Sequence, residues 1–310
     1  MTARTAPANQ YTRRTLLVLA AAAPLLQASA HLQSGTGPAR ADTLAQDLFA
    51  IEARTGGRIG VAALNLATGR VLSHRGDERF AMCSTFKWLL AGLILNRVER
   101  GEEDLQRRIE YTADELVTYS PVTERHAGRG GMTIDELCAA TIGRSDNTAA
   151  NLLLASLGGP AGFTERVRRF GDNVTRLDRL EPALNENAPG DPRDTTNPLA
   201  MIGLMEHFLF GDALRPDSRN RLRNWMIAAD TGLTRLRAGL PDGWTAGDKT
   251  GTSNTGVNND VAFAMPPENG PDAGRGPVLI VSFIDAPDPF SPQINSAHRA
   301  VAESVIQALL

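Results

Sequence analysis

Apolar residues recur with two different spacings along this chain of 310 residues. Near the amino end, helical spacing predicts a helix over Asp42–Arg54, and alternation of apolar and polar residues over Ile59–Leu66 predicts a strand. The turn-forming residues 67–70 lead into a second short strand, Val71–His74. The first part of the chain is therefore expected to be a helix followed by a hairpin.

Helical spacing dominates the middle of the chain, and strand-like runs return towards its carboxyl end. Helices are predicted over three central segments, which are Thr85–Glu99, Ile134–Ile142 and Asn147–Ser156. The later segments are predicted to be three strands and a closing helix, namely Trp244–Thr252, Val261–Met265, Val278–Ile284 and Ala297–Leu310.

Strands at both ends with helices between them predict an α+β fold. In this fold an antiparallel sheet is flanked by helices, and an all-helical lobe is inserted into the sheet lobe. The sheet lobe is expected to comprise residues 42–80 and 228–310, and the helical lobe residues 81–227. An active site is expected in the cleft where the two lobes meet.

Composition narrows the class of protein. The chain has 42% hydrophobic and 22% charged residues and a formal net charge of −3, which is typical of a soluble globular protein and does not favour a nucleic-acid partner. The five histidines are scattered without the spacing of zinc ligands, so neither a metal nor a cofactor is expected. Cys83 and Cys138 are expected to be buried free thiols, with a disulfide between them as the alternative in an oxidising compartment.

The amino end has the three parts of an export signal. Two arginines, Arg13 and Arg14, precede an apolar run, and small residues at a cleavage site end with Ala30. The paired arginines indicate the twin-arginine type of signal, with an ordinary secretory signal as the alternative. A second cleavage site is present at 39–41. Removal of residues 1–30 is expected to leave a mature chain without a membrane anchor.

The 32 basic residues include only two lysines, Lys87 and Lys249. Lysine can lose its proton in a buried site, whereas arginine stays charged. A role in proton transfer would therefore explain why these two positions have lysine. Ser84 precedes Lys87 by three residues, which on a helix brings the amine near the hydroxyl. A serine nucleophile needs such a neighbour to take its proton. At a helix start, the N–H of Ser84 can also stabilise an oxyanion.

Two further motifs lie later in the chain. Ser145–Asn147 precedes a predicted helix, where residues of these types commonly act as caps. Lys249 and Thr250 end a predicted strand and can hold a carboxylate, while Gly251 lets a substrate approach the backbone. A lysine on an edge strand before a turn is the plain alternative.

The segment 179–196 is rich in proline and polar residues and is predicted to be a compact irregular loop. Arg179 and Asp194 can close the neck of this loop through an ion pair. Near its start, Glu181 and Asn185 offer a carboxylate and an amide that together can hold a water molecule.

Together these segments resemble those of class A serine β-lactamases, whose signature contains the three short motifs in this order. The resemblance includes the Ω-loop 179–194, Tyr119–Glu124 and Met132–Thr133, and it covers nearly the whole mature chain. It is greatest to the chromosomal cephalosporinase branch of proteobacteria. It implies the β-lactamase/transpeptidase-like fold and hydrolysis of penicillins and cephalosporins through a serine acyl-enzyme, which gives antibiotic resistance.

The resemblance also implies a role for each residue of the motifs. Ser84 is the nucleophile, and either Lys87 or Glu181 acting through water activates it. Ser145 relays a proton to the leaving nitrogen, and Asp146 is structural. The backbone N–H groups of Ser84 and Thr252 are implied to stabilise the oxyanion of the reacting carbonyl. The side chains of Glu181 and Asn185 are implied to hold the deacylating water. The implied substrate-binding residues are Tyr119, Asn147, Arg235, Lys249, Thr250, Gly251, Thr252 and Ser253.

Two departures from the family pattern affect substrate binding. Asn258 stands where many members have an arginine, so Arg235 is expected to support Lys249 in holding the substrate carboxylate. Ser253 stands where some carbapenem-hydrolysing members have a cysteine paired with the one before the nucleophile, so that disulfide cannot form here. The resemblance otherwise implies a monomeric periplasmic enzyme whose partner is a small β-lactam.

Two other functions share part of this pattern. A D-alanyl-D-alanine peptidase has the serine, lysine and K-T-G parts but lacks the water site of Glu181 and Asn185. A penicillin-binding sensor acylates once without turnover and needs a membrane tether, and no spanning segment follows residue 30 of this sequence.

Overall fold

A sheet of five antiparallel strands forms the centre of the computed structural model, which describes residues 38–310. The strands lie in the order β2-β1-β9-β8-β7. Their bounds are Arg58–Asn65 for β1, Arg70–His74 for β2, Thr245–Thr252 for β7, Val257–Met265 for β8 and Val278–Asp285 for β9. Both ends of the described chain therefore contribute to one sheet, which confirms the prediction from the strand patterns.

Eight helices accompany this sheet within the described residues. They are α1 (Pro38–Thr55), α2 (Phe86–Glu99), α3 (Ile134–Gly143), α4 (Asn147–Leu157), α5 (Gly159–Arg168), α6 (Pro198–Leu209), α7 (Pro216–Ile227) and α8 (Pro292–Leu309). Two short strand pairs, β3 (Phe80–Ala81) with β6 (Thr195–Thr196) and β4 (Arg108–Ile109) with β5 (Met132–Thr133), tie loops together.

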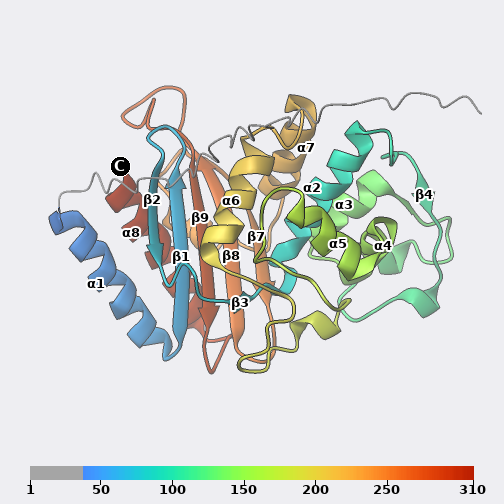
Figure 1. Cartoon of the computed structure of the whole chain (residues 1–310), viewed down its shortest axis with the longest axis horizontal. Coiled ribbons are helices and arrows are strands. Elements are labelled where there is room, and N and C mark those ends of the chain that lie inside the picture. Colours follow the sequence, from blue (N-terminus) through green and yellow to red (C-terminus); the bar gives the residue numbers. More distant parts are fainter. Residues whose placement is uncertain (1–37) are drawn as a thin grey trace, which may run out of the picture. The chain divides into compact units, whose positions relative to one another are not determined.

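Alternation along the strands divides the core between the two faces of the sheet. On β1, Val61 and Ala63 face one hydrophobic cluster, whereas Ala62 and Leu64 face the other. The first cluster is covered by α1 and α8, which pack against each other at one side of the sheet (Figure 1). The second continues from the opposite face into the helices. The α+β prediction is confirmed in this arrangement.

Helix α6 lies across β1 and β9, although its segment falls in the range expected for the helical lobe (Figure 1). The core cluster beneath it joins strand residues such as Phe283 to helix residues such as Leu153 and Phe163, all fully buried. Sheet and helices on this face therefore share one continuous core, which gives the site between them a rigid support.

Helices α5, α6 and α7 are not among those predicted from the sequence. Helix α7 buries only Leu222 and Met226, which is too thin an apolar stripe to stand out in the sequence. Helix α6 begins at Pro198 after the cap Asn197, whose side chain accepts a hydrogen bond from Ala200 N.

In the described part of the chain, no helix is long and apolar enough to cross a membrane. The predicted signal at 1–30 lies outside the described residues.

Candidate active site

Ser84 lies in a short 3-10 turn, Cys83–Thr85, that leads directly into α2. The backbone before it is held from two directions, because Met82 N donates to Asp194 O (2.9 Å) and Asn259 Nδ2 donates to Ala81 O (2.8 Å). Cys83 has a positive φ of 46°, a strained conformation for a residue with a side chain. The surrounding contacts therefore fix the turn that presents Ser84 to the cleft.

Lys87 is fully buried on α2 behind Ser84. Its Nζ lies 2.9 Å from Glu181 Oε1, and it donates to Asn147 Oδ1 (2.5 Å) and to the backbone carbonyl of Ser145 (2.8 Å). Burial lowers the pKa of the Lys87 amine, and the Glu181 carboxylate opposes that shift. Ser84 Oγ is itself 3.4 Å from Glu181 Oε1, a long hydrogen bond. The Glu181 carboxylate thus contacts both Ser84 and Lys87.

Glu181 is held at both its backbone and its side chain. Its N–H donates to Asn151 Oδ1 (2.9 Å), and Asn151 Nδ2 donates back to Glu181 O (2.9 Å). Asn185 Nδ2 donates to Glu181 Oε2 (2.6 Å), which brings together the predicted water-holding pair. The sequence analysis did not single out Asn151; its position four residues after Asn147 on one face of α4 was the available signal.

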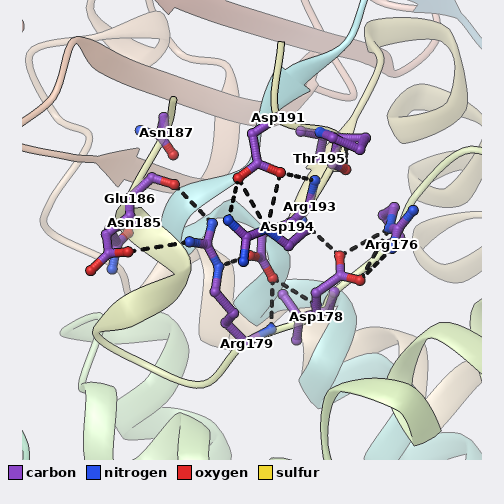
Figure 2. A network of polar contacts seen from close by, with 12 residues as sticks. Arg176, Asp178, Arg179, Asn185, Glu186, Asn187, Asp191, Arg193, Asp194 and Thr195 are labelled. Carbon is purple, nitrogen blue, oxygen red and sulfur yellow. Dashed lines mark hydrogen bonds and ion pairs between the residues drawn. The ribbon is translucent and has the colours of Figure 1, made fainter. Parts of the chain in front are cut away.

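The neck of the Ω-loop is closed by the ion pair expected from the sequence. Arg179 Nε lies 2.6 Å from Asp194 Oδ2, and Asp194 Oδ1 accepts from the backbone N–H groups of Asp178 (2.7 Å) and Arg179 (3.0 Å). Asp178 in turn accepts from Asp194 N (3.0 Å) and pairs with Arg176, as Figure 2 shows. This reciprocal network, which holds Asp194 at a φ of 58°, anchors both ends of the loop that carries Glu181.

The side chains of both lysines meet at Ser145. Lys249 Nζ donates to Ser145 Oγ (3.0 Å), and Lys87 Nζ lies 3.5 Å from the same oxygen. Burial, together with the nearby positive charge of Lys87, lowers the pKa of Lys249 to about 7. The Ser145 hydroxyl therefore lies within reach of two buried amines, both with lowered pKa values.

Asp146 and Asn147, which follow Ser145 in the S-D-N motif, have different environments. Asp146 caps α4 through Ala149 N (2.9 Å) and accepts from Val122 N and Thr123 N at 2.9 Å each, which confirms a structural role. Asn147 lines the cleft, with Oδ1 bound to Lys87 and Nδ2 donating to Thr118 O (2.8 Å). Its amide group still has a second N–H for a ligand.

The β7 side of the cleft carries the K-T-G motif at the edge of the sheet. Thr250 Oγ1 donates to Thr231 Oγ1 (2.8 Å). A Cβ on Gly251 would lie 3.1 Å from Ser84 N and 2.7 Å from Met82 O, so glycine allows the strand to approach the turn that carries Ser84. The hydrogen bonds of Arg235 go to Thr252 Oγ1 (3.0 Å) and Asn259 O (2.7 Å).

A cleft of about 890 Å³ gathers these parts. Ten of the residues proposed from the sequence line it, namely Ser84, Tyr119, Ser145, Asn147, Asn185, Arg235, Thr250, Gly251, Thr252 and Ser253. The other three, Lys87, Glu181 and Lys249, are buried next to them. Tyr119, one of the lining residues, is exposed. No cluster of metal-ligating side chains is present among residues 38–310.

Comparison with known proteins identifies the family. The chain matches the family model of the β-lactamase enzyme family over residues 43–309. A solved structure of an ancestral class A β-lactamase is 52% identical, with a TM-score of 0.81, and the match covers 86% of this chain and 99% of that one. The chain belongs to the class A β-lactamases. Among relatives, β-lactamase OXY-2 of Klebsiella oxytoca is 42% identical, with 96% of this chain and 98% of that protein covered. β-Lactamase CTX-M-8 of Citrobacter amalonaticus is also 42% identical, over 94% and 97% of the two chains.

This class A enzyme joins its Ω-loop to the β7–β8 turn through a residue that the sequence analysis missed. Asn187 Nδ2 donates to Ser253 Oγ (2.8 Å) and Thr255 Oγ1 (3.2 Å) and lies 3.9 Å from Cys83 Sγ (Figure 2 shows Asn187 in the loop). Cys83 and Cys138 are buried free thiols, and burial raises the pKa of Cys83 to about 12. Asn187 therefore joins the Ω-loop to the lining of the cleft by hydrogen bonds.

Proposed function

We propose that this class A β-lactamase hydrolyses the lactam ring of penicillins and cephalosporins through an acyl-enzyme on Ser84. The observation that carries the proposal is the position of Glu181, whose carboxylate lies 3.4 Å from Ser84 Oγ, 2.9 Å from Lys87 Nζ and 2.6 Å from Asn185 Nδ2. One carboxylate thus lies next to the nucleophile, its lysine and the amide of the water site. This arrangement supports both halves of a hydrolytic cycle.

In the first half, Ser84 Oγ attacks the lactam carbonyl carbon and its proton passes to Lys87, or to Glu181 through water. The N–H groups of Ser84 and Thr252 stabilise the oxyanion. The lactam C–N bond then breaks, and Ser145 passes a proton to the leaving nitrogen. The contacts between the Ser145 hydroxyl and both lysines support that relay.

In the second half, a water molecule held by Glu181 and Asn185 attacks the ester carbonyl, and Glu181 accepts its proton. The ester C–O bond breaks, and Ser84 recovers its hydroxyl proton. The double hydrogen bond of the Glu181 backbone with Asn151 supports this role, because it fixes the base relative to Ser84.

The substrate carboxylate is proposed to bind Lys249, Thr250 and Arg235, with Thr252 at the end of β7 and Ser253 directly after it beside them. Arg235 is 3.0 Å from Thr252 Oγ1, and its charge contributes to the lowered pKa of Lys249. A substrate carboxylate there would offset the mutual repulsion of these cations. Asn147 is proposed to bind the side-chain amide, Gly251 to let the acyl group approach, and Tyr119 to flank the ring.

The contact between Glu181 and Asn185 in the Ω-loop favours hydrolysis over the two alternative functions, a D-alanyl-D-alanine peptidase and a penicillin-binding sensor. A peptidase or a sensor that acylates without turnover has no use for a carboxylate and an amide held together beside the acylated serine. The experiment is turnover of a chromogenic cephalosporin by the purified chain and by Ser84→Ala. Many turnovers by the parent and none by the variant support hydrolysis at Ser84. A parent that stops after one equivalent contradicts it.

We also propose that residues 1–30 are a twin-arginine signal and that the mature enzyme is a periplasmic monomer. The support is the sequence of the amino end together with the family, since those residues lie outside the described part of the chain. Mass analysis of enzyme from the periplasmic fraction tests cleavage near Ala30. Replacement of Arg13 and Arg14 by lysine is expected to keep the enzyme in the cytoplasm.

A further inference from the structure

Phe290 is the most exposed large apolar side chain in the described part of the protein. Its exposed fraction is 64%, and it lines the active-site cleft, as does Tyr119 with 57%. Phe49, exposed to 57%, lies on α1, outside the residues that line the cleft. A single exposed phenylalanine needs no explanation, but an exposed aromatic ring on the wall of a substrate cleft provides apolar contact area for a ligand.

A chain of buried polar side chains fixes the backbone directly before Phe290. Asn258 Nδ2 donates to Pro289 O (2.8 Å), Asn258 Oδ1 pairs with His298 Nε2 (3.1 Å), and His298 Nδ1 pairs with Ser282 Oγ (2.9 Å). All three side chains are buried. Burial lowers the pKa of His298 well below its ordinary value, so the ring is neutral and has one N–H. Because Asn258 Oδ1 can only accept, that N–H lies on Nε2.

The carbonyl of Pro289 determines which way Asn258 points, because a carbonyl oxygen only accepts and must therefore face Nδ2. With Oδ1 bound to His298, the amide Nδ2 is directed at Pro289 O, and the turn at residues 288–290 is held against β8. Phe290 N donates in addition to Asp288 Oδ1 (3.1 Å), which tightens the same turn. The residue that stands where many relatives have an arginine therefore positions a cleft residue.

Phe290 lies on the side of the cleft where the substrate carboxylate is proposed to bind. It precedes α8, and Asn295 in the first turn of that helix accepts from Arg235 Nε (3.2 Å). The same Arg235 contacts Thr252, so Arg235 connects the start of α8 to β7. In a cephalosporin, the ring carbon next to the one bearing the carboxylate carries the variable substituent. That substituent would extend towards Phe290.

We infer that Phe290 is a specificity-determining residue that contacts an aromatic ring substituent beside the substrate carboxylate, and that Asn258 is its positioning residue. The inference rests on the proposed hydrolysis of cephalosporins. It explains why an exposed phenylalanine and a buried Asn-His-Ser chain occur together at this end of the cleft. It assigns to Asn258 a task other than binding the carboxylate itself.

The test uses two cephalosporins with the same acyl side chain, one with an arylthiomethyl group and one with a methyl group at the variable position. The ratio of their kcat/KM values isolates the substituent, because acylation occurs while the substituent is still present. In Phe290→Ala the ratio is expected to fall about 3- to 10-fold, the size of one aromatic contact, and Phe290→Tyr is expected to restore it. Phe49→Ala serves as the matched control and is expected to leave the ratio unchanged.

Asn258→Ala tests the positioning role by the same ratio. A fall like that of Phe290→Ala, with no further fall in the double variant, supports it. An unchanged ratio in Phe290→Ala, with both compounds still hydrolysed, overturns the inference even if Asn258→Ala does not fold. Failure of the parent to turn over either compound instead contradicts the proposed function, so the two failures are distinguishable.

Discussion

Lys87 Nζ lies 2.9 Å from Glu181 Oε1, and neither side chain has any exposed surface. A buried ion pair of this kind is stable only when its remaining hydrogen-bonding groups also have partners. Here Asn147 and the Ser145 carbonyl accept from Lys87, and Asn185 donates to Glu181. Helix α2 and the Ω-loop are thereby joined next to Ser84, so Glu181 cannot be displaced without disturbing Lys87.

The Ω-loop neck is expected to contribute to both stability and deacylation. Arg179→Ala removes the partner of the buried Asp194 carboxylate, which keeps only its backbone donors, and is expected to lower the free energy of unfolding by about 2–3 kcal/mol. The measurement is urea unfolding, with the deacylation rate taken from the decay of the acyl-enzyme. Arg193→Ala breaks the solvent-exposed pair with Asp191 and is the matched control. Equal effects of the two substitutions would show that the neck has no special role.

The lowered pKa of Lys249 predicts a pH dependence of substrate capture. Because its pKa is about 7, Lys249 is charged below neutral pH and loses its proton as the pH rises. kcat/KM for a substrate with a free carboxylate is therefore expected to fall as the pH rises through about 7, since kcat/KM reports groups of the free enzyme.

Lys249→Arg keeps the charge and is expected to abolish that fall, although its absolute rate is lower. The methyl ester of the same substrate lacks the carboxylate and is expected to show no such fall with the parent enzyme. A fall of equal size for acid and ester would mean that another group titrates in this range.

The Asn187 bridge is expected to keep the Ω-loop closed over Cys83. Loss of its amide in Asn187→Ala removes about 1–2 kcal/mol of hydrogen bonding, so labelling of Cys83 by a thiol reagent is expected to be about 5–30-fold faster. Peptide mapping separates Cys83 from Cys138, which lies buried on α3 and reports global unfolding. Equal acceleration at both cysteines would indicate general destabilisation instead of loop opening.

Local patterns in the sequence were enough to predict much of the fold. Alternation predicted β1 and strand-like runs predicted the other strands of the sheet, although β8 begins at Val257, before the predicted Val261. Helical spacing predicted α1, α2, α3, α4 and α8 to within a few residues. The start of α8 is the largest of these differences, because Ser291 caps the helix and Pro292 opens it five residues before the predicted position, Ala297. The assignment of residues 81–227 to a separate helical lobe remains a prediction, because α6 lies in that range and packs on the sheet.

The candidate site was predictable where chemistry requires rare residue types. Two lysines among many arginines marked Lys87 and Lys249, and the motifs around them supplied their partners. The contacts of Asn187 and Asn258 could not be found in this way. Their partners, Ser253 and Pro289, lie 66 and 31 residues away, and asparagine has many ordinary structural uses. Such contacts become visible only when the tertiary structure brings distant segments together.

The most direct test of the account is the fate of the acyl-enzyme in Glu181→Ala, followed by intact mass after mixing with a cephalosporin. The account predicts that the variant is acylated once at Ser84 and that the adduct persists while the parent turns over many times, a difference of at least about 100-fold in deacylation. Glu165→Gln, which alters an exposed glutamate on α5, is the matched control and is expected to turn over like the parent. Rapid loss of the adduct from Glu181→Ala would contradict the assignment of Glu181 as the deacylating base.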